Sequence, residues 1–252
     1  MGKENTDDGV DSTHGYLHSL ETGAAVDGPG VRCAVFLSGC NMHCLYCHNP
    51  DTWKLHAGEP VTLEQVMDKI RPYAAFLRHA GGVTLTGGEP LVQKDFAVAI
   101  LRGCKALGLH TALDTQGYLG SRLSNDELDA IDLFLLDIKL MNPEAYLRLT
   151  GAELQPTLDF AKRLAERKKK VWLRYVLVPG YTDADAEVKQ LAIFASELGN
   201  IERVDILPFH QLGQHKWEEL GKTYTLAGVQ PPTEEAVERA RSIFREYGLN
   251  TV

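Results

Sequence analysis

Short apolar segments typical of strands alternate along most of the chain with longer segments of helical periodicity. Six strand-like segments are rich in β-branched and apolar residues, and apolar residues recur three or four positions apart in the stretches that follow them. The six predicted strands cover residues 31–37, 83–86, 110–114, 133–137, 171–178 and 204–207. This alternation predicts parallel strands covered by helices, arranged as a doubly wound sheet or as an open barrel.

The predicted helices carry boundary signals of their own. Thr62 and Gln65 have the form of a capping box, and Pro72 predicts a kink in the helix that they begin. Cys104 falls on the apolar face of the next helix, over residues 96–107, so we expect it in the core. Four further helices are predicted over residues 125–130, 158–167, 185–198 and 234–247.

Chain length and charge limit the domain organisation and the partners. We expect one α/β domain over residues 14–252, preceded by a flexible tail over residues 1–13, which are polar and lack apolar periodicity. A net charge of -8 disfavours a nucleic-acid partner. No apolar run reaches the roughly 20 residues of a membrane span, and the N-terminus does not resemble a signal peptide. We therefore expect a cytoplasmic protein without a membrane partner, and a monomer.

Three of the five cysteines lie close together. Cys40, Cys44 and Cys47 form a C-x₃-C-x₂-C pattern that supplies three thiolates in a tight loop. A structural zinc site uses four protein ligands, whereas a four-iron cluster held by three thiolates leaves one iron free for an external ligand. His43 or His48 could complete a zinc site, so zinc stays an alternative to the favoured open iron–sulfur site.

Further polar residues follow the predicted strands, where the reactive groups of such folds gather. Paired glycines such as Gly87 and Gly88 let the backbone approach a ligand closely, and Glu89 can pair with an ammonium group. A charged Arg174 within an apolar strand needs a partner, which favours a pairing role in the site. The other residues at these positions are Asp114, Thr115, Asp137, Ile138, Lys139 and His210.

The cysteine spacing resembles the signature of the radical S-adenosylmethionine superfamily, and Tyr46 matches the aromatic residue that usually precedes its third cysteine. The resemblance implies a 4Fe-4S cluster held by Cys40, Cys44 and Cys47. It also implies S-adenosylmethionine on the free iron. Reductive cleavage of this cofactor gives a 5′-deoxyadenosyl radical, which abstracts a hydrogen atom from the substrate.

The order and spacing of several motifs resemble one subgroup, the pyruvate formate-lyase activating enzymes. These motifs cover residues 26–32, 47–53, 113–117, 174–180 and 215–217. No cysteine lies between Cys47 and Cys104, so the chain lacks the cysteine-rich ferredoxin-like insert of several other activases. Gln116 stands where an asparagine is common in the subgroup.

The resemblance implies a partial (β/α)₆ TIM-like barrel of parallel strands with outer helices, in one radical S-adenosylmethionine domain. Its implied substrate is pyruvate formate-lyase, which would receive a glycyl radical, and its implied electron donor is a low-potential protein such as flavodoxin or ferredoxin. An activase of another glycyl radical enzyme and a zinc-stabilised binding or regulatory module remain alternatives.

The resemblance also implies roles for individual residues. Asp114, Thr115 and Asp137 would hold a monovalent cation, Na⁺ or K⁺. The residues that would bind S-adenosylmethionine are Tyr46, Cys47, His48, Gly87, Gly88, Glu89, Asp137, Ile138, Lys139, Arg174 and His210.

Overall fold

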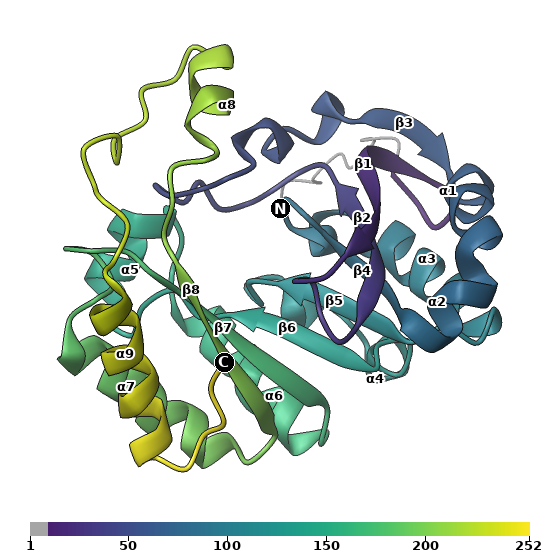
Figure 1. Ribbon diagram of the computed structural model, residues 1–252. Coiled ribbons are helices and arrows are strands. Elements are labelled where there is room, and N and C mark those ends of the chain that lie inside the picture. The colour runs from purple at the N-terminus through teal and green to yellow at the C-terminus, as the bar shows by residue number, and fades with distance from the viewer. Residues whose placement is uncertain (1–9) are drawn as a thin grey trace, which may run out of the picture.

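The computed structural model describes residues 10–252, so most of the predicted tail lies outside the described residues. Its centre is one eight-stranded sheet in the order β3-β1-β2-β4-β5-β6-β7-β8 (Figure 1). The strands are β1 (His14–Ala24), β2 (Val31–Leu37), β3 (Glu59–Thr62), β4 (Gly81–Gly87), β5 (Thr111–Thr115), β6 (Leu133–Asp137), β7 (Lys170–Leu177) and β8 (Ile201–Pro208). Strands β2 and β4 to β8 are parallel, and they correspond to the six predicted strands.

The sheet curls into an open barrel with helices on its outer side (Figure 1). Strands β3 and β8 end the sheet, which does not close on itself over residues 10–252. The helices are α1 (Leu63–Ile70), α2 (Ala74–Ala80), α3 (Lys94–Ala106), α4 (Asn125–Leu128), α5 (Pro143–Thr150), α6 (Gln155–Glu166), α7 (Asp185–Leu198), α8 (Gln214–Glu219) and α9 (Glu234–Glu246). The architecture confirms the predicted partial (β/α)₆ barrel, since helices follow parallel strands along most of the sheet.

Local signals in the sequence explain how the first helices form. The Thr62 hydroxyl accepts a hydrogen bond from the backbone of Gln65, and the Gln65 side chain accepts one from the backbone of Thr62, so the capping box is confirmed. A short 3₁₀ turn over Arg71–Tyr73 separates α1 from α2, which confirms the kink at Pro72. Cys104 is fully buried on α3, as predicted.

The antiparallel strands β1 and β3 were not predicted, because β1 carries many polar residues and little alternation. Tertiary contacts stabilise β1 instead. The Gln93 side chain accepts a hydrogen bond from the Tyr16 amide (2.7 Å) and donates to the Tyr16 carbonyl (2.8 Å), as a neighbouring strand would. The described end of the predicted tail is also hydrogen-bonded, since the Thr13 carbonyl accepts from the amide of Leu63.

The register of the parallel strands brings their C-terminal ends to one rim. Phe36 pairs with Thr86, and Asp137 pairs with Arg174. Polar side chains that are far apart in the sequence therefore meet at the same end of the barrel. Among residues 10–252, no helix is long and apolar enough to cross a membrane.

Candidate active site

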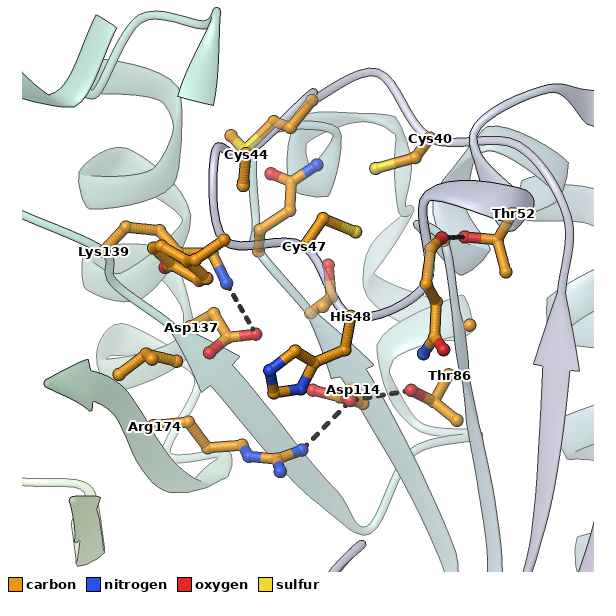
Figure 2. A pocket seen from close by; sticks show the side chains of 18 of the residues that line it. Cys40, Cys44, Cys47, His48, Thr52, Thr86, Asp114, Asp137, Lys139 and Arg174 are labelled. Carbon is orange, nitrogen blue, oxygen red and sulfur yellow. Dashed lines mark hydrogen bonds and ion pairs between the residues drawn. The ribbon is translucent and has the colours of Figure 1, made fainter. Parts of the chain in front are cut away.

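A cavity of about 320 Å³ opens at this rim (Figure 2). It brings together residues from the cysteine loop and from the ends of β4, β5, β6 and β7. The predicted site residues that line it are Cys40, Cys44, Tyr46, Cys47, His48, Gly87, Gly88, Asp114, Thr115, Asp137, Lys139 and Arg174. Glu89, Ile138 and His210 lie close by without lining it.

The cysteine loop follows β2 and is held by backbone hydrogen bonds at its start and near Cys44. The Cys40 amide donates to the Trp53 carbonyl (3.1 Å), and the Leu45 amide donates to the Leu149 carbonyl (2.9 Å). Cys40 and Cys47 point toward the space between them (Figure 2). All three loop cysteines are free thiols. The loop thus presents three sulfurs to one cavity without a disulfide.

Burial disfavours ionisation of these thiols. It raises the pKa of Cys44 to about 12, and it raises the pKa values of Cys40 and Cys47 as well. Lys139 opposes the rise at Cys44. A bound cationic metal centre reverses this preference, because metal ligation deprotonates a thiol.

Buried polar atoms around the cavity indicate a bound ligand with polar groups of its own. Over residues 10–252, no three His, Cys, Asp or Glu side chains converge closely enough to hold one ion. Four cavity residues each carry a buried polar atom that has no hydrogen-bond partner within the described chain: Tyr46 Oη, Trp53 Nε1, Asp114 Oδ1 and Arg174 Nε. Buried polar atoms are rarely left unpaired, so these atoms indicate a ligand with polar groups of its own.

The glycine pair packs directly against the start of the cysteine loop. The amide of Gly88 donates to the Leu37 carbonyl, and the amide of Glu89 donates to the Gly39 carbonyl. A Cβ on Gly88 would lie 2.3 Å from the Gly39 oxygen, and Gly87 has a φ of 115°. Only glycine fits both positions without a backbone shift, so the pair brings the end of β4 against the loop.

The Glu89 carboxylate is fully buried and is turned into the protein. It accepts hydrogen bonds from the amides of Leu91 and Gln116 (both 3.0 Å) and from the Thr115 hydroxyl (2.9 Å). Burial raises the pKa of Glu89 to about 7, while these hydrogen bonds oppose the rise. Glu89 therefore ties the glycine loop to the end of β5, and its predicted pairing with an ammonium group stays a prediction.

Two acid–base pairs occupy the ends of β5, β6 and β7. Asp114 Oδ2 accepts from the Thr86 hydroxyl (2.7 Å) and from Arg174 Nη1 (3.1 Å), which confirms that Arg174 has a partner within the site. Lys139 Nζ lies 3.1 Å from Asp137 Oδ2 (Figure 2). Burial raises the pKa of Asp114, and Arg174 opposes that rise. The two carboxylates are thus each matched by one cation.

The two predicted histidines contact each other. The rings of His48 and His210 stack with centroids 4.1 Å apart, and His48 Nε2 lies 3.0 Å from the His210 carbonyl oxygen. Burial lowers the pKa of His48. His48 lines the cavity, and His210 stacks on its ring without lining the cavity.

Several cavity residues were not predicted as site residues. Phe36, Thr86 and Leu207 are strand residues whose types are common in any core, and only the strand register could have indicated them. Val176 is also a strand residue, but it falls within the motif over residues 174–180. The others are Asp27, Met42, Asn49, Thr52, Trp53 and Gln116. Asp27, Asn49, Thr52, Trp53 and Gln116 fall within motifs of the subgroup, which could have singled them out.

Comparison with known proteins agrees with this geometry. The family model of the radical SAM superfamily matches residues 35–192, which is more than half of the chain. The fold and the cysteine loop thus define a radical SAM protein.

Similar proteins specify the subgroup. A pyruvate formate-lyase 1-activating enzyme from Escherichia coli strain K12 is 44% identical over 240 residues, which cover 94% of this chain and 98% of the relative. A pyruvate formate-lyase-activating enzyme from Listeria monocytogenes is 42% identical over 236 residues, covering 91% of this chain and 95% of that protein. The chain belongs to the pyruvate formate-lyase-activating enzyme family of the radical SAM superfamily.

A solved structure supports the same assignment. The crystal structure of a domain of pyruvate-formate lyase-activating enzyme from Bacteroides vulgatus aligns with a TM-score of 0.57 and 26% identity. The alignment covers 69% of this chain and 98% of that domain.

Proposed function

We propose that this enzyme activates pyruvate formate-lyase by placing a glycyl radical on it, with a 4Fe-4S cluster and S-adenosylmethionine as cofactors. The observation that carries the proposal is the cavity itself, where the three free thiols of Cys40, Cys44 and Cys47 meet the Gly87-Gly88 loop and two buried acid–base pairs. The names of the relatives give the protein substrate.

The three cysteines would hold the cluster and leave one iron for the cofactor. When bound and reduced, the cluster and S-adenosylmethionine supply a 5′-deoxyadenosyl radical that takes a hydrogen atom from a glycine of the protein substrate. The contribution of the chain is to bind, to orient and to exclude water. Burial of Cys44 and Tyr46 supports this role, because it keeps solvent from their part of the cavity, while Cys40 and Cys47 are half-buried.

The remaining site residues would bind the cofactor. Gly87 and Gly88 would offer backbone atoms to its amino group, with Glu89 holding their loop. Lys139 and Arg174 would balance its carboxylate, and Asp114, Thr115 and Asp137 would hold a monovalent cation beside it. The unpaired buried atoms Asp114 Oδ1 and Arg174 Nε support polar partners here. The other proposed cofactor contacts are Tyr46, His48, Ile138 and His210.

The glycine of the protein substrate would lie against the apolar residues that line the cavity. Phe36, Val176 and Leu207 line the cavity beside the buried charges. Apolar walls suit a backbone glycine, which brings no charge of its own, and they keep water from a reactive radical.

Further proposals concern the protein as a whole. We infer that residues 14–252 work as one radical SAM domain and that the protein is a monomer. A low-potential protein such as flavodoxin or ferredoxin would deliver the electron. The free cysteines suit a reducing cytoplasm, which supports that location.

Electron paramagnetic resonance on pyruvate formate-lyase tests the proposed function. The anaerobically reduced protein and S-adenosylmethionine should produce a glycyl radical signal on pyruvate formate-lyase, together with 5′-deoxyadenosine. Cofactor cleavage without that signal would indicate another glycyl radical substrate. A zinc-loaded protein that cleaves no cofactor would indicate a zinc-stabilised module instead.

A further inference from the structure

Trp53 carries a buried polar atom that neither the fold nor the proposed cofactor contacts explain. Its indole Nε1 has no hydrogen-bond partner within the described residues. Leaving a buried donor unpaired is unfavourable, so such an atom calls for an acceptor. The residue also lies at the base of the cysteine loop, where its backbone carbonyl accepts from the Cys40 amide.

The sulfur of Cys47 is the acceptor within reach. Burial raises the pKa of Cys47, and two donors, the Asn49 amide and the Trp53 side chain, oppose that rise. Trp53 Nε1 still has no hydrogen-bond partner within the described residues, and a neutral thiol is a weak acceptor. A thiolate carries charge and accepts more strongly. The indole therefore gains its partner once Cys47 becomes a thiolate ligand.

Neighbouring rings hold the indole in this position. The His43 ring lies on Trp53 with centroids 4.5 Å apart, and the Trp217 ring meets it edge to face at 5.0 Å. Trp217 also fixes the ligand residue itself, because its Nε1 donates to the Cys47 carbonyl (2.9 Å). The Trp53 side chain is thus oriented toward Cys47 before any cluster binds.

We propose that the Trp53 indole N–H donates a hydrogen bond to the Cys47 thiolate and thereby raises the reduction potential of the cluster. The inference rests on the proposed function, because it requires a cluster on Cys47. Reduction adds one negative charge to the cluster, and part of that charge resides on the ligand sulfurs. A donor aimed at one of these sulfurs stabilises the reduced state more than the oxidised state, so the one-electron reduction becomes easier.

The substitution Trp53→Phe removes the N–H and keeps an aromatic ring between His43 and Trp217. Its cluster should show a more negative midpoint potential in a redox titration followed by electron paramagnetic resonance. Trp172→Phe is the matched control, because the Trp172 ring packs under Arg203 and away from the cysteine loop. That variant should keep the potential of the unaltered protein. Equal potentials for Trp53→Phe and the unaltered protein would overturn the proposal.

A second measurement needs no substitution at Trp53. The chain has three tryptophans, so the protein can be labelled with ¹⁵N-indole and its reduced cluster studied by electron–nuclear double resonance. One exchangeable indole proton should couple to the cluster, and the coupling should persist in Trp172→Phe and in Trp217→Phe. A cluster that cleaves S-adenosylmethionine without this coupling would overturn the Trp53 inference alone. A protein that assembles no cluster would overturn the proposed function with it.

Discussion

The loop thiols resist ionisation, so cluster assembly must displace their protons. Burial raises the pKa values of Cys40, Cys44 and Cys47 and is the largest influence on each. Because a ligand sulfur must be a thiolate, binding of iron releases these protons and gains in strength as the pH rises. Because ionising a buried thiol is costly, these cysteines should bind a strongly charged iron centre in preference to a weakly charged group.

Replacing one loop cysteine should remove the cluster without unfolding the chain. Cys44→Ala takes away one of three iron ligands, so the purified protein should hold little iron and should form no 5′-deoxyadenosine. Cys33→Ala is the control, since Cys33 is a fully buried strand residue outside the loop and its loss should leave the iron content unchanged. Iron analysis measures the cluster content of both variants, and chromatography measures the 5′-deoxyadenosine that they form. Full turnover by Cys44→Ala would refute the cluster assignment.

Asp137 should contribute to cofactor binding and not to the cluster. Asp137→Ala removes the carboxylate that pairs with Lys139 and that would hold the monovalent cation. Loss of one buried charged interaction of about 1.4 kcal/mol corresponds to about tenfold weaker S-adenosylmethionine binding. Isothermal titration of the anaerobic protein measures this affinity, with the iron content as control. Unchanged affinity would remove Asp137 from the cofactor site.

Glu89 should make the stability of the protein depend on pH. Its pKa rises from the ordinary 4.5 to about 7 on burial, so between these values the folded state holds a proton that the unfolded state has released. The free energy of unfolding therefore falls as the pH rises through this range, by about 3 kcal/mol. Glu89→Gln should lose this part of the slope. Denaturation of the cofactor-free protein at several pH values measures it, and identical slopes for both proteins would contradict the burial argument.

At the scale of elements, the close contact between the β4 end and the cysteine loop should be sensitive to a single methyl group. An alanine at Gly88 would place its Cβ 2.3 Å from the Gly39 oxygen, which forces the loop to move and costs about 1–3 kcal/mol. We expect Gly88→Ala to lower both stability and iron content. Gly228→Ala is the control, because nothing lies within 4 Å of its added methyl group. Denaturant titration compares the two, and equal stability would show that the contact is unimportant.

The sequence predicted the elements that carry strong local patterns. The six parallel strands are short and apolar, and the capping box at Thr62 marks the start of α1. Two elements that it did not predict depend on distant partners: β1 is held by the side chain of Gln93, and α8 packs through the buried Trp217. Local propensity carries no trace of such contacts, because they form only in the folded chain. Helix α5 was also missed, although Asn142 caps it and Gly151 ends it.

The sequence predicted the site residues whose type suggests a chemical role. Cysteines, paired glycines and charges at strand ends indicated most of the cavity, while Phe36 and Leu207 were missed because the register alone places them there. The direction in which a side chain points could not be predicted from the sequence either. The sequence did not show that the Glu89 carboxylate accepts hydrogen bonds from the backbone amides of Leu91 and Gln116, and its pairing with an ammonium group stays a prediction.

At the scale of the whole molecule, the open barrel explains why the site residues lie at one rim of the sheet. The parallel strands deliver charged groups to one rim, and the sheet, with β3 and β8 at its two ends, stays open over residues 10–252. The cysteine loop lies across the same rim, so its thiols and the strand-end charges share one cavity. A backbone glycine of another protein could reach such a site without either protein unfolding its core.

The three loop sulfurs should hold a cluster and leave one iron open to the cofactor. The most direct test of this arrangement is the electron paramagnetic resonance spectrum of the anaerobically reduced protein, recorded with and without S-adenosylmethionine. We predict the signal of a reduced 4Fe-4S cluster whose shape changes when the cofactor is added, because the cofactor binds the iron that lacks a cysteine. A zinc-containing protein without this signal, or a cluster signal that the cofactor leaves unaltered, would contradict the account.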